Sequence, residues 1–361
     1  MAALSPYRVR LFSINLVSGR GPDTDNGVRA VIDDASDIGV SSYANDIGEM
    51  FFTLPMTHPQ ISECVPLERH YEVSRRNAAG TYEVIHKGIL EDYDATKDEV
   101  VFYGHDYLGF FTKSVLTSTT SYTNTLIGTI INNTFTARQN EANSPVGFLG
   151  TGTIDATSRT VTVTAPHEEY LSFWSGLCQI LAAGGTTRPM VYIDLSADNF
   201  FNFDDNRGSD KQNVRLEFGG AILDFRYNLG FANLRHRNRA IGVKREGATV
   251  LYSTQTTGSA SQYGTLDMAT LFTDVINQAS LDSLALSAVR DAFDRSGNLY
   301  ISLAQGHCKP LDGWDLGDSI RLVVQRGIVD INDLYTVWGW EWIGRKDGSE
   351  SLFLDVQPKL T

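Results

Sequence analysis

The residue pair in this 361-residue sequence that most suggests chemistry is His105 beside Asp106. A histidine titrates near neutral pH, so an adjacent carboxylate invites an acid–base interpretation. The same aspartate follows an aromatic strand and Gly104, and it stands where it can cap a helix predicted over Tyr107 to Leu116. Capping explains the pair without catalysis, and the structural interpretation is favoured.

Adjacent carboxylates are the next candidates for catalysis. They occur as Asp33 with Asp34, Glu168 with Glu169, and Asp204 with Asp205. A glycosidase needs two carboxyl groups across a cleft, which sequence separation does not reveal, so acidic loops are the simpler interpretation. The segment from Asp204 to Asp210, DDNRGSD, weakly resembles a calcium-binding loop but lacks the distal glutamate of such a loop.

Motifs for metal, cofactor or nucleophilic chemistry are not found. The seven histidines are scattered, without HExxH or zinc spacing, and the sequence has no GxSxG or phosphate-binding loop. Cys64, Cys178 and Cys308 lie far apart and are expected to be buried, reduced thiols. We therefore expect no enzyme activity, no metal and no cofactor.

A tryptophan-rich strand is the first candidate binding feature. In YTVWGWEWI, strand alternation places Trp338, Trp340 and Trp342 on one face. Such a row could stack on a sugar, lie in a subunit interface, or fill a core. Aromatic rows most often stabilise sheets through cross-strand pairs, so core or interface is favoured over a ligand site.

A basic cluster is the second candidate. Arg235, Arg237 and Arg239 surround His236 in a chain with a net charge of −13. A solvated loop between two strands is the commoner explanation for such a cluster. The alternative is contact with a phosphate or with an acidic neighbouring subunit, which would steer assembly.

Composition limits the classes of function. With 42% hydrophobic and 20% charged residues, the chain can build large cores, and its length fits two to three domains. The net negative charge argues against binding to nucleic acid but is compatible with lining a channel through which DNA passes. Neither a membrane-length apolar run nor a signal peptide is visible, so we expect synthesis in a cytoplasm.

Elements predicted from periodicity indicate a β-rich α+β fold. Strands dominate the first segment and return after about Asn213, and an Asp347-Gly348 turn joins the last two strands. Helices are expected from Leu126 to Phe135, Glu168 to Ala183 and Leu281 to Phe293. The predicted domains are a first antiparallel β-barrel or sandwich over 1–115, a mixed α/β domain over 116–212, and a second barrel with a helical insert over 213–361. The alternative is that the two barrels are interleaved along the chain.

Three stretches carry a resemblance to a known family. They are GILEDYDATKDEVVFYGHDYLGFF with the preceding IGEMFFTLPMTHP, then EEYLSFWSGLCQILAAGG leading to VYIDLS, and finally GWDLGDSIRLVV with YTVWGWEWIG and SLFLDVQPKL. Together they make the chain resemble the tail hub proteins of long-tailed phages, the baseplate-hub or late control protein D-like minor tail proteins.

The resemblance implies a structural role in the virion tail tip. It implies a homotrimer whose two tube-like barrels make a six-fold-looking ring around the DNA exit channel. Its partners would be the distal tail or tail tube protein, the tip or fibre proteins and the tape measure protein. The alternative is a β-rich receptor- or carbohydrate-binding minor tail protein with the tryptophan strand as ligand face.

Overall fold

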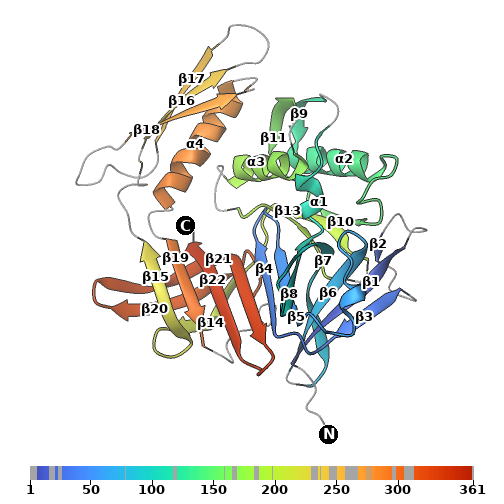
Figure 1. The fold of residues 1–361 in the computed structure, drawn as a ribbon. Helices are drawn as coiled ribbons and strands as arrows, with labels where there is room; N and C mark the ends of the chain where they lie inside the picture. Colours follow the sequence, from blue (N-terminus) through green and yellow to red (C-terminus); the bar gives the residue numbers. More distant parts are fainter. Residues whose placement is uncertain are drawn as a thin grey trace.

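The computed structural model describes residues 6–15, 21–22, 27–77, 79–116, 120–157, 159–164, 169–182, 187–196, 198–228, 235, 237–243, 250–256, 267–273, 275, 278–294, 298–304 and 313–359. Within them lie two barrel-like antiparallel modules, a mixed α/β domain and a small sheet covered by one helix (Figure 1). The predicted β-rich α+β fold is confirmed.

The first barrel is a curved antiparallel sheet in the order β4-β5-β8-β7-β6-β1-β3. Its strands are β1 (Tyr7–Asn15), β2 (Gly21–Pro22), β3 (Val28–Ile32), β4 (Asp37–Tyr43), β5 (Glu49–Pro55), β6 (Arg69–Arg76), β7 (Tyr82–Ala95) and β8 (Glu99–Asp106), with a 3-10 turn at Ile61–Glu63. Alternation along β1 determines its faces, since Val9 and Leu11 are fully buried and pair with Val73 and Tyr71 of β6.

The mixed α/β domain follows the first barrel and has its own core. It contains α1 (Gly109–Thr112), β9 (Ser121–Leu126), α2 (Ile127–Gln139), β10 (Gly150–Ile154), β11 (Thr160–Thr164), α3 (Tyr170–Ala182), β12 (Met190–Ile193) and β13 (Phe200–Asp204). Phe135 of α2 stacks on Phe201 with ring centroids 4.2 Å apart, and Trp174 of α3 donates its Nε1–H to Thr134 Oγ1 over 2.8 Å. This aromatic centre confirms the helices predicted around Phe135 and Trp174.

The second barrel is assembled from two separate parts of the chain. Its strands are β14 (Asp210–Glu217), β15 (Ile222–Asn228), β19 (Asn298–Leu303), β20 (Ser319–Arg326), β21 (Val329–Arg345) and β22 (Glu350–Pro358). They run β15-β19-β22-β21-β20-β14, antiparallel except for the parallel β14–β20 pair. The Asp347-Gly348 turn between β21 and β22 is confirmed, with Gly348 at φ 84° as the turn requires.

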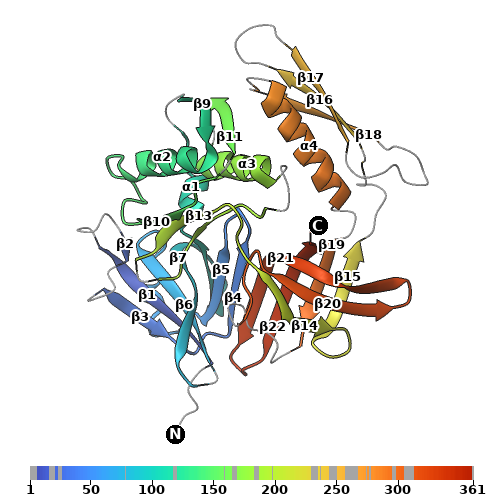
Figure 2. The same ribbon diagram turned by 180° about the vertical axis from the view of Figure 1, so that it is seen from behind.

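A small unit, here called the insert, lies between β15 and β19. It consists of β16 (Arg237–Val243), β17 (Val250–Thr256), β18 (Asp267–Thr273) and α4 (Gln278–Asp294). Both views place α4 on the side of the sheet that faces the rest of the molecule (Figures 1 and 2). The insert has a core of its own, formed by Ala240, Val275, Leu281 and Ala285.

The two barrels are joined edge to edge through β4 and β21. Fourteen of the described strands consequently form one sheet that runs from β2 in the first barrel to β15 in the second. The buried side chains beneath it form one continuous cluster that contains residues of both barrels. The domain ranges 1–115, 116–212 and 213–361 remain predictions.

Candidate functional site

The seam between the barrels is built by the long strand β21. Its first half pairs with β20, and its second half pairs with β22 on one side and β4 on the other. The β4 register runs from Gly339 opposite Tyr43 to Arg345 opposite Asp37. One strand therefore belongs to both barrels and fixes their relative position.

The three tryptophans of β21 do not share one face, and that prediction is wrong. Val337 pairs with Val356 and Gly339 pairs with the preceding Asp355, so Trp338 is an extra residue in a β-bulge. A one-residue bulge reverses the alternation beyond it. Val337 at 0% exposure therefore shares the core face with Trp340 at 3% and Trp342 at 0%, while Trp338 is half-buried.

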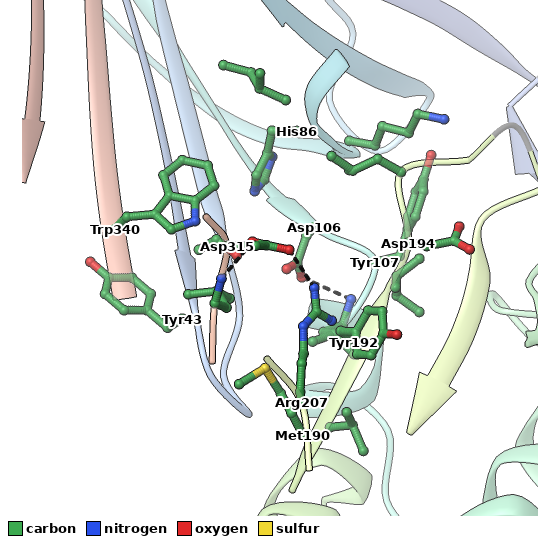
Figure 3. Close-up of a pocket in the computed structure, with 18 of the residues that line it drawn as sticks. Tyr43, His86, Asp106, Tyr107, Met190, Tyr192, Asp194, Arg207, Asp315 and Trp340 are labelled. Atoms are coloured by element: carbon green, nitrogen blue, oxygen red, sulfur yellow. Dashed lines mark hydrogen bonds and ion pairs between the residues drawn. The ribbon is translucent and has the colours of Figure 1, made fainter. Parts of the chain in front are cut away.

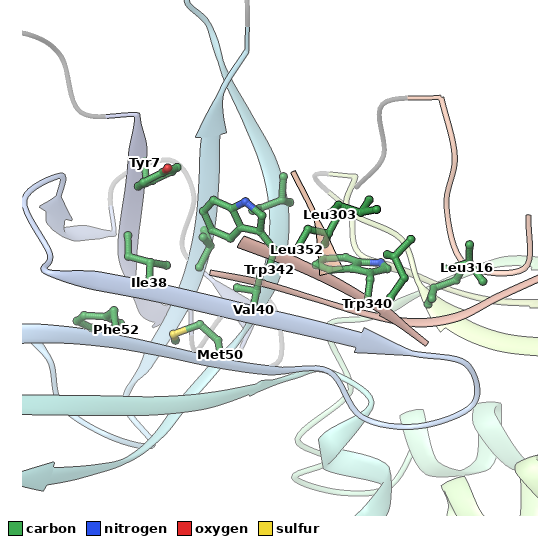
Figure 4. Packing of buried hydrophobic residues seen from close by; sticks show 14 of the residues in the cluster. Tyr7, Ile38, Val40, Met50, Phe52, Leu303, Leu316, Trp340, Trp342 and Leu352 are labelled. Carbon is green, nitrogen blue, oxygen red and sulfur yellow. The ribbon is translucent and has the colours of Figure 1, made fainter. Parts of the chain in front are cut away.

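The two buried tryptophans fill opposite sides of the seam (Figure 4). Trp342 meets Tyr7 of the first barrel edge to face, with ring centroids 4.9 Å apart. Trp340 lies toward Leu303 and Leu316, which belong to the second barrel (Figure 4). A sugar cannot stack on rings enclosed in this way, so these two residues are core rather than a ligand face.

A cavity of about 370 Å³ lies where the first barrel, β12 and the second barrel meet (Figure 3). On one wall, Arg207 donates to Asp315 Oδ2 over 2.7 Å, and its guanidinium carbon lies 3.5 Å from the centre of the Tyr192 ring. These contacts tie β12 of the mixed domain to the loop before β20. The cavity is thus walled by side chains that hold three parts of the chain together.

Asp106 closes another wall of this cavity. Its Oδ2 accepts the Gly48 amide over 2.9 Å and its Oδ1 accepts the Leu108 amide over 2.9 Å. Burial raises the pKa of Asp106 to about 7, against the lowering effect of these amides. A side chain at Gly48 would come within 2.6 Å of the Ser41 carbonyl and 2.9 Å of Asp106, so only glycine fits.

The helix predicted after Asp106 is shorter than expected. It is the single turn α1, and Asp106 accepts from Leu108 two residues on, as in a local aspartate turn, instead of capping ten residues of helix. Tyr107, Leu108 and Phe111 nevertheless point into the core of the mixed domain. The motif therefore links the first barrel to that core.

His105 and Asp106 do not form an acid–base pair. His105 Nδ1–H donates to the Asp106 carbonyl over 2.6 Å, and its Nε2 lies 3.5 Å from Glu91, while the Asp106 carboxylate binds backbone amides. His86 behind them hydrogen-bonds the Tyr71 hydroxyl over 3.0 Å, and burial lowers the pKa of His86 to about 4. The geometry favours a structural cluster over a proton-transfer site.

The remaining acidic pairs and cysteines lie apart. Asp34 contacts His58 over 2.9 Å, Tyr192 donates to Asp204, and the Asp205 amide donates to Asp155. Cys64 and Cys178 are buried free thiols, whereas Glu168, Cys308 and His236 lie outside the described residues. Over the described ranges, no group of three or more potential ligands is arranged around a metal position. No helix among those ranges is long and apolar enough to span a bilayer.

The arginine cluster lies mainly on a strand, so its interpretation as a loop is corrected. Arg235 precedes β16, and Arg237 and Arg239 are on β16 itself, projecting from the face opposite α4. Arg237 makes a two-pronged pair with Asp267 at 2.8 and 2.7 Å, and Arg239 Nε lies 3.3 Å from the same carboxylate. The strand β18, which carries Asp267, was not predicted.

The same face of the insert continues into an exposed apolar surface, here called the insert face. Beyond Arg239, the register aligns Ile241 with Tyr252 and Leu271. Tyr252 is 69% exposed and Leu271 is 65% exposed, and Val243 and Val250 extend the patch at the sheet's end. Large apolar side chains on an outward sheet face indicate a contact surface.

An acidic groove of about 820 Å³ on the outer face of β4, β5 and β8 was not predicted either. It holds the carboxylates of Glu49, Glu91, Asp92 and Glu341, with Lys113 paired to Glu91. Its floor is aromatic, and Tyr43 and Tyr103 are 38% and 43% exposed. Its local mark is a glycine opposite an aromatic residue, as in Gly39 opposite Phe51 and Gly339 opposite Tyr43, and this pairing is visible only once the strands are aligned.

Comparison with known proteins identifies the fold. No protein-family model matches the sequence, and no curated protein matches it either. The tail protein from Neisseria meningitidis MC58 is similar in structure, with a TM-score of 0.63 and 12% identity over 98% of this chain and 96% of that one. The 43 kDa tail protein of prophage MuSo2 from Shewanella oneidensis gives a TM-score of 0.66 and 10% identity over 97% and 98%.

A wider structural similarity extends to a chain of a larger complex. A chain of the PdpA–VgrG complex has a TM-score of 0.54 and 8% identity, over 98% of this chain and 64% of that one. Such low identities establish a shared fold. The resemblance to phage tail hub proteins, predicted from the three sequence stretches, is confirmed at that level.

Proposed function

We propose that this chain is a structural protein of a phage tail tip, a hub that forms a homotrimeric ring around the DNA exit channel. The ring would join the hexameric tail tube, or a distal tail ring, to the tip. The observation that carries the proposal is the fusion of two barrels through β4 and β21 into one sheet over one core.

The symmetry of the proposed ring explains why two barrels are fused in one chain. Three chains with two barrels each supply six modules, which can face a six-fold tube while the chain itself repeats three times. Such a ring requires the two barrels of each chain to keep a fixed angle. Two buried tryptophans and the strand β21, which pairs with β4 of the first barrel, supply that rigidity.

The charge of the chain suits a channel wall. At −13, its surface repels the DNA backbone, so DNA would pass without sticking. The proposed partners are other copies of the chain, the distal tail or tube protein, the tip or fibre proteins and the tape measure protein, all in the virion tail tip. The similar fold of two tail proteins and of a chain in a VgrG complex supports this assignment.

The proposed role is not enzymatic. His105 and Asp106 bind separate backbone partners, and the similar chains are named as tail proteins. The alternative of a carbohydrate-binding tail protein loses its motivating feature, because Trp340 and Trp342 are enclosed in the core.

The test is the mass of the full chain in solution, followed by imaging with the tail tube protein. We expect a particle of three times 39.8 kDa and a three-fold ring at the tube's end. A chain that stays monomeric at every concentration, and that does not bind the tube protein, would contradict the proposal.

A further inference from the structure

We propose that the insert face docks on the acidic groove of a second copy of this chain. This inference rests on the proposed ring and names the two surfaces that close it. The insert face comprises the outward side chains of β16, β17 and β18, and the groove lies on the outer face of β4, β5 and β8.

The insert face is turned away from its own chain. The other face of the same sheet packs on α4, where Leu281 and Ala285 are fully buried. The helix α4 in turn contacts α3 of the mixed domain, so it lies between the insert sheet and the body of the molecule (Figures 1 and 2). Ile241, Tyr252 and Leu271 therefore remain exposed to solvent until another molecule covers them.

The excess positive charge of the insert face favours a partner with an acidic surface. Arg237 and Arg239 share the single carboxylate of Asp267, which leaves one positive charge in excess. The Arg239 side chain is 63% exposed, so its guanidinium can donate to a second carboxylate. On a chain of net charge −13, this combination of cation and apolar surface is suited to another copy of the chain itself.

The groove offers the matching charge. Four carboxylates line it, and its one lysine is already paired with Glu91. Glu49 is exposed at the start of β5, and Glu341 projects from β21 into the same groove. An arginine from a neighbouring chain would thus meet uncompensated negative charge.

The shape of the groove also matches a sheet face. A side chain carbon on Gly39 would lie 2.1 Å from the Phe51 ring, and one on Gly339 would lie 2.4 Å from the Tyr43 ring. Both rings therefore cover a glycine and belong to the aromatic floor of the groove. This aromatic surface against Ile241, Tyr252 and Leu271 gives the apolar centre and charged rim typical of protein interfaces.

The two surfaces are different, so the contact is head-to-tail. Each copy would give its insert face to one neighbour and its groove to the other. Head-to-tail contacts close into rings when the rotation allows, which is what the proposed three-fold collar requires.

The first test replaces Tyr252 with glutamate in the full chain. Because Tyr252 is 69% exposed, Tyr252→Glu leaves the fold intact but places a charge in the apolar centre. We expect the trimer to dissociate at concentrations at least tenfold higher than for the wild type, measured by analytical ultracentrifugation. Ile328→Glu, at a fully exposed isoleucine in the turn between β20 and β21, which belongs to neither surface, should leave the mass unchanged.

The second test reverses charge on both surfaces. Arg239→Glu and Glu49→Lys should each weaken the trimer, and the double variant should recover at least half of the combined loss on a logarithmic scale. If the losses in trimer stability of the two single variants simply add in the double variant, Arg239 and Glu49 do not interact. That result would overturn the proposed contact between the insert face and the groove. Trimers unaffected by Tyr252→Glu and Arg239→Glu would overturn the docking of the insert face and leave the proposed function intact. A monomeric wild type would overturn both.

Discussion

The seam between the two barrels differs from the insert in where the large apolar side chains lie. At the seam, the side chains of Trp340 and Trp342 are enclosed between two barrels that share one core. In the insert, the described core is four residues, and the larger apolar side chains of Tyr252 and Leu271 face solvent. The seam therefore fixes the relative position of the two barrels, whereas the insert presents an apolar surface that a partner can cover.

This difference separates stability from assembly. Side chains that fix the barrel angle are unavailable to partners, and side chains available to partners contribute little to the isolated fold. We therefore expect substitutions at the seam to change the free energy of unfolding, and substitutions on the insert face to change association.

The largest expected effect is at the centre of the seam. Trp342→Ala removes a fully buried indole that packs on Tyr7, and truncating a buried tryptophan costs about 3–5 kcal/mol. The free energy of unfolding, measured with urea, should fall by that amount. Trp338→Ala on the same strand is the matched control, and because Trp338 is half-buried at the bulge, its loss should be less than half as large. Equal losses would contradict the division of faces made by the bulge.

A smaller and more local effect is expected in the insert. Leu281→Ala empties the centre of the insert core, where Leu281 is fully buried against Gly242, at a cost of about 2–5 kcal/mol. Among the described strands, those of the insert pair only with one another, so the insert should open on its own. Hydrogen exchange should accelerate at least tenfold in β16, β17 and β18 and stay unchanged in the barrels. Leu223→Ala, at a 62% exposed leucine of β15, is the control. Equal acceleration in both regions would show that the insert is not independent.

Much of the fold could be predicted because strand alternation and turn chemistry are local. The turn at Gly348 and the helices α2 and α3 depend on neighbouring residues, and they were predicted near their observed bounds. The bulge at Trp338 was not predictable, because one extra residue reverses the faces and leaves no mark in the strand's own sequence.

The surfaces proposed for assembly were missed for a different reason. The groove joins Tyr43 to Glu341, and the insert joins Arg237 to Asp267 across 30 residues, so both exist only after distant strands pair. The arginines were noticed as a cluster, but alternation alone did not reveal their apolar neighbours on β17 and β18. Local patterning predicted the tryptophan strand β21 but missed β18, and it did not reveal which strands become neighbours.

The subtlest effect concerns the buried carboxyl beside the seam. Between about pH 4 and pH 7 the folded chain keeps a proton on Asp106 that the unfolded chain releases, because burial raises the pKa of Asp106 from 3.8 to about 7. The contribution of this group to the free energy of unfolding therefore falls as pH rises, by roughly 1.4 kcal/mol per pH unit.

Asp106→Asn cannot ionise, so the wild type should lose stability relative to this variant across that window and show a constant difference outside it. The neutral His86 has the opposite pH dependence, since burial lowers its pKa to about 4, but it is present in both proteins and cancels in the comparison. Urea unfolding of both proteins from pH 3 to pH 8 measures the difference, and a difference independent of pH would mean that Asp106 stays ionised in the cavity and that the seam tolerates a buried charge.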